Sequence, residues 1–342
     1  MTHTLKHHWL AILAGTGLSA AALAWDALPL QVPVPADNPQ TEAKIELGKQ
    51  LFFDPRFSST GTISCNTCHN LFLGGDDNRP TSMGVHGRTG PRNAPTVWNS
   101  AFHATQFWDG RAASLEEQAK GPVVASVEMG MADLDMVAKR MRAITGYQAA
   151  FARAFGGDNP VSIDNAAKAV AAFERTLITP NSPYDRWAQG DANAMLPNQV
   201  QGLLLFDQLG CTGCHQAPFF GGPNKRGGHF AVFPFHDGEY VGTYNLRADM
   251  GRHAVTGRKS DRHKYKVPTL RNVALTAPYF HNGAVPTLDQ AVRVMATTQL
   301  NATLFEEEVA HISAFLNALT GEFPSIAMPR LPPTPGASIP TE

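Results

Sequence analysis

The chain of 342 residues has only four cysteines, and its net charge of -1 is close to neutral. Its 28 lysines and arginines balance 29 acidic residues, so the composition gives no indication of a nucleic-acid partner. After the N-terminal segment, no stretch reaches the roughly 20 consecutive apolar residues that a membrane helix needs. Hydrophobic residues make up 43% of the chain, which is enough for the cores of two ordinary domains.

The few cysteines all fall into two copies of one motif. The pattern Cys-x-x-Cys-His occurs at residues 65–69 and again at residues 211–215. In c-type haem attachment, the two thiols form thioethers with the haem vinyl groups and the histidine becomes the proximal iron ligand. We therefore predict two covalently bound haem c groups. Their attachment residues are Cys65, Cys68 and His69 for the first haem, and Cys211, Cys214 and His215 for the second.

Two other interpretations of the cysteine pairs stay open at this point. Two CxxC pairs can supply four thiolates to a tetrahedral zinc ion. In an exported protein each pair can also oxidise to a disulfide. Neither interpretation explains why a histidine follows both pairs directly, and haem attachment is therefore favoured.

The N-terminus has the pattern of a secretory signal peptide over residues 1–24. Lys6 lies in a weakly basic leader, residues 9–22 form a short apolar core, and Ala22-Leu23-Ala24 fits a cleavage site. We expect a mature protein that begins near Trp25, lies in the periplasm and does not span the membrane. An uncleaved anchor is the alternative. Export also suits covalent haem attachment, which takes place outside the cytoplasm in bacteria.

Apolar residues at helical spacing predict a mainly α fold with long loops. Helices are expected over residues 41–53, 132–144, 163–177, 198–209, 288–295 and 306–319, and a further helix is expected to begin at Ser114. Residues 70–97 are rich in Gly, Pro, Asn and Asp and predict a long loop. Residues 219–249 predict loops or a short hairpin.

A short repeat precedes both haem motifs. Gly48-x-x-Leu51-Phe52 matches Gly202-x-x-Leu205-Phe206, and each is followed by a turn and CxxCH. This indicates two duplicated cytochrome c-like haem domains. We place the first domain at residues 25–180 and the second at residues 181–320, with the tail at 321–342 expected to pack on the first domain.

The insertions between the two motifs contain candidates for catalysis. A pure electron carrier is best served by irons capped on both faces, whereas a catalyst needs one open iron with an acid–base group above it. Trp108, Gln118 and Glu128 lie in one such insertion, and His86 lies in the loop before it. Trp108 alone is typical of a core aromatic, and Gln118 and His86 are typical of exposed positions. Glu128 between Val127 and Met129 is harder to explain, because an acid is costly to bury.

Several separated motifs, in the same order, resemble the bacterial di-haem cytochrome c peroxidases and their MauG-like relatives. They are GVHG at 84–87, RNAPT at 92–96, FWDGR at 107–111, VEMG at 127–130, VPTLRN at 267–272 and TAPYFHNGAVPTL at 276–288. The resemblance covers nearly the whole mature chain. It implies an enzyme that reduces hydrogen peroxide to water with electrons from a small cytochrome c or a cupredoxin. A MauG-like oxidase that modifies a protein side chain and a non-catalytic di-haem electron carrier are the alternatives.

The resemblance also implies roles for residues at matching positions. His69 would hold the peroxidatic, low-potential haem and His215 the high-potential, electron-accepting haem. His86 would close the first iron at rest and move away on reduction of the second haem. Gln118 and Glu128 would form the distal pair of the first haem, and Trp108 would lie between the two porphyrins.

Further matches concern calcium, the last iron ligand and assembly. Asn93 and the backbones of Thr276 and Pro278 match a calcium site between the domains, and family members are commonly homodimers. Of the methionines after His215, which are Met250, Met295 and Met328, Met295 matches the ligand position. A thioether favours Fe(II). MauG-like enzymes have a tyrosine there, so this methionine favours a peroxidase. Arg271 and His281 also lie in matching motifs, and we expect structural roles for them, such as propionate or interface contacts.

Overall fold

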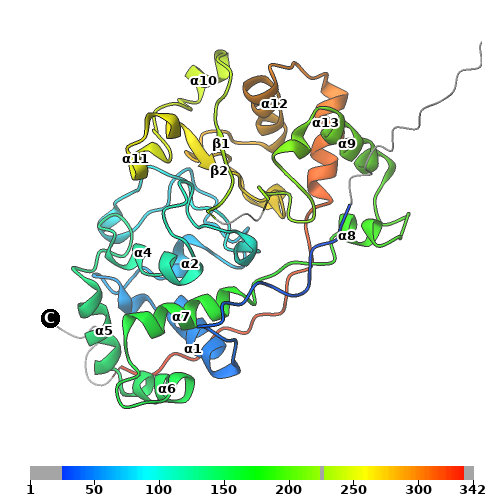
Figure 1. Cartoon of the computed structure of the whole chain (residues 1–342). Helices are drawn as coiled ribbons and strands as arrows, with labels where there is room; N and C mark the ends of the chain where they lie inside the picture. The colour runs from blue at the N-terminus through cyan, green and yellow to red at the C-terminus, as the bar shows by residue number, and fades with distance from the viewer. Residues whose placement is uncertain (1–24, 224–226, 335–342) are drawn as a thin grey trace, which may run out of the picture.

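Helices in two groups, joined by long loops, make up nearly all of the regular secondary structure of the computed structural model, which describes residues 25–223 and 227–334 (Figure 1). The predicted fold class, mainly α with two cytochrome c-like haem domains, is confirmed. The predicted signal peptide at residues 1–24 lies outside the described residues. Within the described ranges, no helix combines the length and the apolar character needed to cross a membrane.

The first group of helices precedes residue 180 and the second follows it. The first contains α1 (Glu42–Phe53), α2 (Cys65–Cys68), α3 (Leu115–Gln118), α4 (Gly121–Val124), α5 (Leu134–Ala143), α6 (Thr145–Phe155) and α7 (Ile163–Glu174). The second contains α8 (Pro183–Ala188), α9 (Pro197–Gln208), α10 (Glu239–Thr243), α11 (His253–Thr256), α12 (Leu288–Leu300) and α13 (Glu306–Asn317). Short 3-10 turns include η2 (Val85–Gly87) and η4 (Cys211–Gly213). Strands β1 (Phe230–Val232) and β2 (Lys264–Lys266) pair antiparallel, with Ala231 opposite Tyr265.

The predicted long helices are present, with differences at their ends and between them. Pro180 and Pro183 in the sequence predict a linker between the two domains, but residues 183–188 form α8, because proline is tolerated in the first turn of a helix. The helix expected to stop at residue 295 continues to Leu300. The sequence analysis missed α6, which begins at Thr145, directly after α5. Residues 219–249 were expected to form loops or a short hairpin; their described part is mostly loop with α10 and β1, and β1 pairs with the distant β2.

The two repeated glycines allow two pairs of helices to cross closely. A Cβ atom on Gly48 would lie 1.9 Å from the carbonyl oxygen of Ala169 on α7. A Cβ atom on Gly202 would lie 1.9 Å from the carbonyl oxygen of His311 on α13. Any larger side chain would push these backbones apart. The glycines therefore fix α1 against α7 and α9 against α13 in the same way.

The repeated phenylalanines complete this arrangement. Phe52 packs edge-on against Phe173 with ring centroids 5.4 Å apart. Phe206 packs against Phe315 at 5.3 Å. Each phenylalanine on α7 or α13 follows the close backbone contact by four residues, which is one helical turn. The short sequence repeat is thus also a structural repeat.

Each helical group surrounds its own hydrophobic core. The fully buried members of the first core lie between Leu47 and Leu177, and those of the second lie between Tyr184 and Leu319. Cys65 packs against the first core and Cys211 against the second. The two haem motifs therefore belong to different cores.

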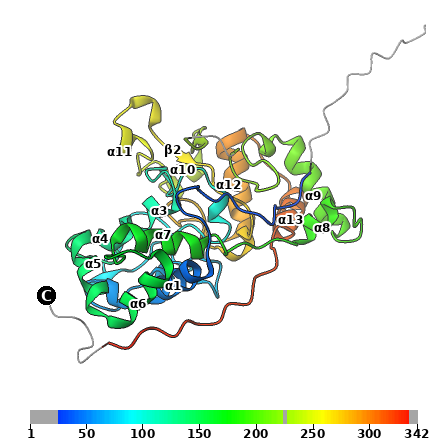
Figure 2. The ribbon, with the colours of Figure 1, turned by 60° about the horizontal axis from the view of Figure 1, so that its bottom comes forward.

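After α13 the chain returns to the first core as an extended segment (Figure 2). The ring of Phe323 packs edge-on against Trp98 at a centroid distance of 4.8 Å. Ile326 packs against the first core. Arg56 donates a hydrogen bond to the carbonyl oxygen of Pro332 at 2.9 Å. Residues 321–334 are called the C-terminal strap below.

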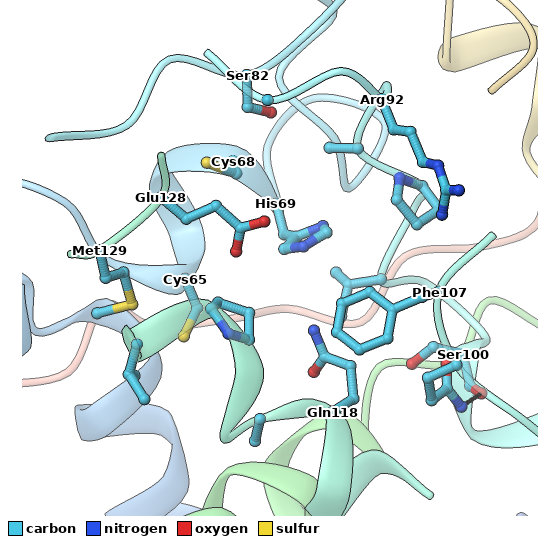
Figure 3. Close-up of a pocket in the computed structure, with 18 of the residues that line it drawn as sticks. Cys65, Cys68, His69, Ser82, Arg92, Ser100, Phe107, Gln118, Glu128 and Met129 are labelled. Atoms are coloured by element: carbon cyan, nitrogen blue, oxygen red, sulfur yellow. Dashed lines mark hydrogen bonds between the residues drawn. The ribbon is translucent and has the colours of Figure 1, made fainter. Parts of the chain in front are cut away.

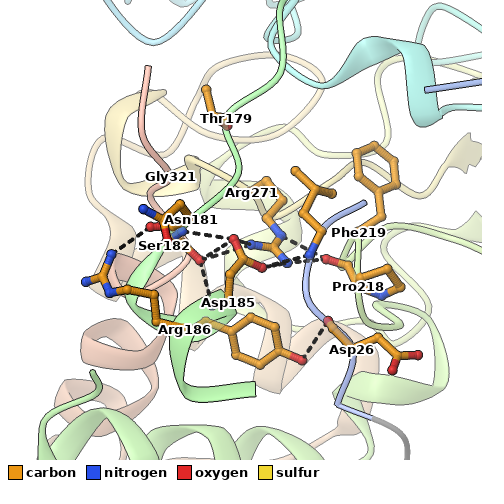
Figure 4. Close-up of polar contacts among 12 residues, drawn as sticks. Asp26, Thr179, Asn181, Ser182, Asp185, Arg186, Pro218, Phe219, Arg271 and Gly321 are labelled. Atoms are coloured by element: carbon orange, nitrogen blue, oxygen red, sulfur yellow. Dashed lines mark hydrogen bonds and ion pairs between the residues drawn. The ribbon is translucent and has the colours of Figure 1, made fainter. Parts of the chain in front are cut away.

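A buried ion pair joins four separate segments of the chain (Figure 4). Arg271, which is 0% exposed, donates to both carboxylate oxygens of Asp185 on α8 at 2.8 and 2.9 Å. It also donates from Nε to the carbonyl oxygen of Pro218, just after the second haem motif, at 2.8 Å. Asp185 in turn accepts from the backbone N–H of Leu28 at 2.8 Å. Arg271 therefore holds the loop after the second motif in place from inside the protein.

Candidate active site

A deep cavity lies beside the first haem motif. It encloses about 1250 Å³ of empty space, counting its open mouth and the solvent within it. Cys65, Cys68 and His69 form part of its wall. Gln118 and Glu128 also line it, and Figure 3 shows their side chains directed into the same space as the ring of His69.

The first motif folds as a single helical turn. Thr67 accepts a hydrogen bond from the backbone N–H of Ser64 at 2.9 Å, which caps the start of α2. The N–H of His69 donates to the carbonyl oxygen of Cys65 at 2.9 Å and ends the turn. Residues three apart on a helix lie on the same face. The turn therefore presents the two thiols side by side, with the histidine directly after them.

The chemical state of the thiols bears on the two other interpretations. Burial, with smaller contributions from Glu174 and Cys68, raises the pKa of Cys65 to about 12. Burial likewise raises the pKa of Cys211 to about 11. None of the four cysteines, all of which lie in the described residues, is joined to another by a disulfide. Zinc binds thiolates, and across residues 25–223 and 227–334 no group of three or more His, Cys, Asp or Glu is placed to hold a metal ion.

Both motif histidines are held in the neutral form that binds iron. Burial lowers the pKa of His69, and it lowers the pKa of His215 to about 4. The Nδ1 atom of His215 lies 3.1 Å from the carbonyl oxygen of Phe220. Such a hydrogen bond fixes the ring orientation and leaves Nε2 as the ligand atom.

Some buried polar atoms around the first cavity lack a partner from the chain. In the part of the chain that the structure describes, Ser100 Oγ and Glu174 Oε2 belong to residues that line this cavity and have no hydrogen bond. Buried polar groups are normally satisfied, so these atoms indicate that the cavity is completed by a bound group. The two thiols, the neutral histidine and the large cavity fit a haem c.

Glu128 has the environment of an acid–base group. Its backbone is fixed, because its N–H donates to the carbonyl of Ala125 at 2.9 Å and its carbonyl accepts from the N–H of Val85 at 2.8 Å. Its side chain is half-buried at the cavity wall. Burial raises the pKa of the carboxyl, and the nearby Arg111 opposes this shift. Such a carboxyl exchanges protons closer to neutral pH than an ordinary glutamate does.

Gln118 ends the one-turn helix α3. Ser114 begins this helix by accepting a hydrogen bond from the N–H of Glu117 at 3.2 Å. The carboxamide of Gln118 is half-buried and projects into the cavity (Figure 3). An amide can donate to and accept from a small polar ligand without exchanging a proton.

Trp108 lines the first cavity and also connects it to the second half of the chain. Its indole N–H donates to the carbonyl oxygen of Asn93 at 2.9 Å. The N–H of Asn93 donates to the carbonyl oxygen of His281 at 2.8 Å, and the rings of Trp108 and His281 lie 6.5 Å apart. The predicted position of Trp108 between two haems is compatible with these contacts.

His86 does not join the other candidates. Its side chain is exposed and is not among the residues that line the cavity. It lies in η2 with a φ of 58°, in a turn closed by a hydrogen bond from the N–H of Gly84 to the carbonyl of Arg88 at 2.8 Å. This turn directs the imidazole toward solvent.

By helical spacing, Met295 shares a face of α12 with two residues of the second core. Leu288 and Val292, which precede it by seven and three residues, pack in the cluster that contains Cys211. Positions at this spacing share one helical face. Met295 is half-buried there, whereas Met328 is 62% exposed on the C-terminal strap.

The sequence analysis missed Glu174 as a cavity residue. It lies on α7 one turn after Val170, is 5% exposed, and burial raises its pKa to about 8. The signal was present, because an acid ends an apolar run of alanine, valine and phenylalanine on a predicted helix. Its side chain adds a second carboxyl, besides that of Glu128, to the wall of the first cavity.

Comparison with known proteins gives consistent matches over the chain. The family model described as di-haem cytochrome c peroxidase matches residues 42–193, and one described as RoxA-like, cytochrome c-like matches residues 264–297. A cytochrome c551 peroxidase from Nitrosomonas europaea is 44% identical, covering 97% of this chain and 96% of its own length. A cytochrome c551 peroxidase from Pseudomonas aeruginosa is 45% identical, covering 91% and 88%.

A solved structure supports the same grouping. The crystal structure of a MauG-like protein associated with microbial copper homeostasis is 31% identical, with a TM-score of 0.75, and covers 86% of this chain and 95% of its own. Together with the geometry of the first cavity, these similarities establish the enzyme class and the haem c cofactor. The chain belongs to the di-haem cytochrome c peroxidase family and is an oxidoreductase of that family.

Proposed function

We propose that this protein reduces hydrogen peroxide to water in the periplasm, with electrons supplied one at a time by a small cytochrome c or a cupredoxin. The observation that carries the proposal is the position of Glu128. Its half-buried carboxyl, with a raised pKa, shares one cavity with Cys65, Cys68 and His69. A di-haem electron carrier would need no acid–base group there.

The proposed chemistry divides between the cavity residues. Reduction of H2O2 to two waters consumes two electrons and two protons, and a bound haem c supplies the redox-active iron. Glu128 as the carboxylate takes a proton from one peroxide oxygen and returns it to the other as the O–O bond breaks. Gln118 orients the peroxide by hydrogen bonding, and Trp108 lies on the path of electrons from the second haem.

Stopped-flow mixing of the half-reduced protein with H2O2 tests this proposal. In this form the second haem is reduced and the first is oxidised. We expect reoxidation of the second haem at a rate that increases with peroxide concentration. A protein that only carries electrons should show no fast peroxide-dependent reoxidation, and that result would contradict the proposal.

A MauG-like oxidase that modifies a protein side chain is the second candidate, and the MauG-like structural relative supports it. The two candidates differ in the distal ligand of the second haem. Met295 at that position supports the peroxidase. Spectra of His/Tyr ligation, or a long-lived state with both haems oxidised beyond ferric, would favour the oxidase.

Replacing His86 with glycine is expected to give activity without prior reduction of the protein. We propose that His86 binds the first iron in the oxidised resting enzyme and swings out to the exposed position that it has here. Glycine suits the left-handed conformation of residue 86, so the turn should still form. EPR of the oxidised protein should show an open first haem in His86→Gly. Arg88→Gly, in the same turn, is the control, and a variant that still needs reductive activation would argue against the gate.

Replacing Met295 with histidine is expected to lower the reduction potential of the second haem. An imidazole ligand stabilises Fe(III) more than a thioether ligand does. The redox equilibrium should therefore change at least tenfold, which lowers the one-electron reduction potential by about 59 mV or more. Redox titration of the Soret and visible bands measures it. Met250→His serves as the control, and a shift in that variant instead would move the ligand to Met250.

Calcium binding near Asn93 is also proposed. Asn78 donates to the carbonyls of Leu275 at 3.0 Å and Ala277 at 3.1 Å. In the described residues, the alternate carbonyls of Thr276 and Pro278 accept no hydrogen bond. The amide of Asn93 donates to the carbonyl of Arg79 at 2.8 Å, which leaves its side-chain oxygen for a cation. Such oxygens are the ligands that Ca²⁺ prefers, and calorimetric titration with Ca²⁺ tests the site.

The homodimer that the resemblance implies stays a prediction, which analytical ultracentrifugation measures. The periplasmic location rests on the predicted signal peptide and on the extracytoplasmic chemistry of haem attachment. N-terminal sequencing of the exported protein tests whether cleavage occurs near Trp25.

A further inference from the structure

Among the described residues, a buried lysine on β2 has no anionic partner. Lys266 is 7% exposed, and none of the residues that the structure describes forms a hydrogen bond or an ion pair with its ammonium group. Its neighbour on the strand, Lys264, reaches the carboxylate of Asp261 at 3.4 Å. Lys266 is fixed in position, because its backbone N–H donates to the carbonyl oxygen of Trp108 at 2.7 Å.

An isolated ammonium group is costly to bury. A charge taken out of water must be paired, or the group loses its proton. Burial alone lowers the pKa of Lys266 to about 7, and no carboxylate of the described chain opposes this shift. A neutral lysine, however, has lost the charge that distinguishes its side chain from an apolar one. The position therefore indicates an anion that the polypeptide itself does not supply.

The surroundings of Lys266 belong to the second haem motif. One titratable group near it is His103, whose pKa is lowered by burial and further lowered by Lys266. The ring of His103 lies 4.6 Å from that of Phe219, four residues after His215.

Two hydrogen bonds hold the residues after Lys266 against the same region. The N–H of Val267 donates to the carbonyl of His229 at 3.0 Å. The hydroxyl of Thr269 donates to the carbonyl of Phe219 at 2.7 Å. The lysine thus lies beside the segment that follows the second Cys-x-x-Cys-His.

We propose that Lys266 forms a buried ion pair with a propionate of the haem attached at Cys211 and Cys214. Each haem carries two propionate carboxylates, which makes it a source of anionic charge at this site. The pair would give this buried lysine the counterion that the described residues of the chain do not supply. A fixed positive charge beside the haem also favours Fe(II) over Fe(III), and so raises the reduction potential.

This inference rests on haem attachment at the second motif and does not depend on peroxide reduction. The test is therefore made without peroxide, on the protein with both haems attached. Lys266→Met removes the charge and keeps most of the apolar volume. Lys264→Met removes a charge two residues away on the same strand and is the matched control. Lys266→Arg keeps the charge.

The two haem potentials are measured by spectroelectrochemical titration. In Lys266→Met, the one-electron redox equilibrium of the second haem should change at least tenfold in favour of Fe(III). Its reduction potential should therefore fall by at least about 59 mV. The first haem should keep its potential. Lys264→Met and Lys266→Arg should both stay close to the unmodified protein. Resonance Raman bands of propionate bending should shift in Lys266→Met alone.

The proposal is overturned if Lys266→Met retains both haems with an unchanged second potential and unchanged propionate bands. It is also overturned if the first haem shifts and the second does not. If Lys266→Met fails to accumulate, Lys266→Gln gives the same comparison. Lys266→Met and Lys266→Gln can both lose the second haem while Lys266→Arg binds it normally. That result supports the ion pair with the propionate, because Lys266→Arg differs from the other two variants in keeping the charge.

Discussion

Replacing Glu128 with glutamine is expected to lower peroxide turnover by about 10²–10⁴-fold while both haems stay attached. Glutamine keeps the size and the hydrogen-bonding oxygen of the side chain and cannot transfer a proton, which is the step that typically contributes this factor. The backbone of Glu128 is held by Ala125 and Val85, so the loop should keep its shape. Steady-state turnover with H2O2 and a haem content assay measure the two quantities separately.

The pH profile of the unmodified protein gives a second readout of Glu128. Burial raises its pKa, and the carboxylate is the form that accepts the peroxide proton. Activity should therefore fall as the pH decreases through this raised pKa, which lies above the value near 4.3 of an unperturbed glutamate. Glu128→Gln should lack that acidic limb, since it has no group to protonate.

Glu307→Gln provides the control for the substitution itself. Glu307 is exposed in the first turn of α13, far in sequence from the cavity. Its variant should keep full turnover and the acidic limb. Near-normal turnover in Glu128→Gln would reject the acid–base role and leave the first cavity without its proposed catalyst.

Replacing Arg271 with methionine is expected to cost about 3–5 kcal/mol of folding free energy. Loss of one partner leaves the other as an uncompensated buried charge, which is the costly way to break such a pair. Here the stranded group is Asp185, which is 1% exposed. The loop at Pro218 also loses its hydrogen bonds from the guanidinium. Urea unfolding followed by circular dichroism measures the loss, and Soret absorbance reports the second haem.

A double-mutant cycle separates the ion pair from simple loss of packing. Asp185→Asn keeps an oxygen for the N–H of Leu28 and removes the charge. Combined with Arg271→Met, it should be less destabilising than the sum of the two single changes, by about 0.5–3 kcal/mol. Additive effects would show that the charges do not interact. Arg293→Met, which breaks a surface pair with the exposed Glu306, should cost no more than about 1 kcal/mol.

The same pair predicts how acid affects stability. Burial by itself raises the pKa of Asp185, but the interactions with Arg271 outweigh it, and the net pKa is lowered. A carboxyl whose folded pKa is depressed stabilises the protein above its unfolded pKa, which is near 3.9 for aspartate. That stabilisation should disappear as the pH falls through the lower folded value. Arg271→Met should lack this contribution at neutral pH.

The sequence allowed prediction of features that depend on local spacing. The CxxCH motif predicts haem attachment, and helical periodicity predicted the long helices. The repeated Gly-x-x-Leu-Phe indicated a duplication, and Gly48 and Gly202 make equivalent close backbone contacts. Features that depend on which distant segments meet were not predictable. The partner of Arg271 lies on α8, in a stretch expected to be a linker.

The candidate site follows the same division. Gln118, Glu128 and Trp108 were identified through matching motifs, and they line one cavity. Glu174 was missed, because its helical position shows burial but not which cavity wall it joins. The exposed side chain of His86 agrees with what its Gly-rich loop alone indicated, and the turn that Gly84 and Arg88 close holds it there. The burial of Lys266 could not be predicted from the sequence, because it depends on where strand β2 lies in the fold.

The C-terminal strap has a consequence for how the protein can be divided. Phe323 and Ile326 pack on a core whose other members lie at least 145 positions earlier in the chain. The domain that is translated first is therefore completed only when these late residues have been translated. A chain cut between Leu177 and Tyr184 would leave Trp98 and Arg56 without these contacts. Expression of the first half alone should therefore yield a poorly packed fragment, and supplying residues 321–334 as a fused peptide should restore it.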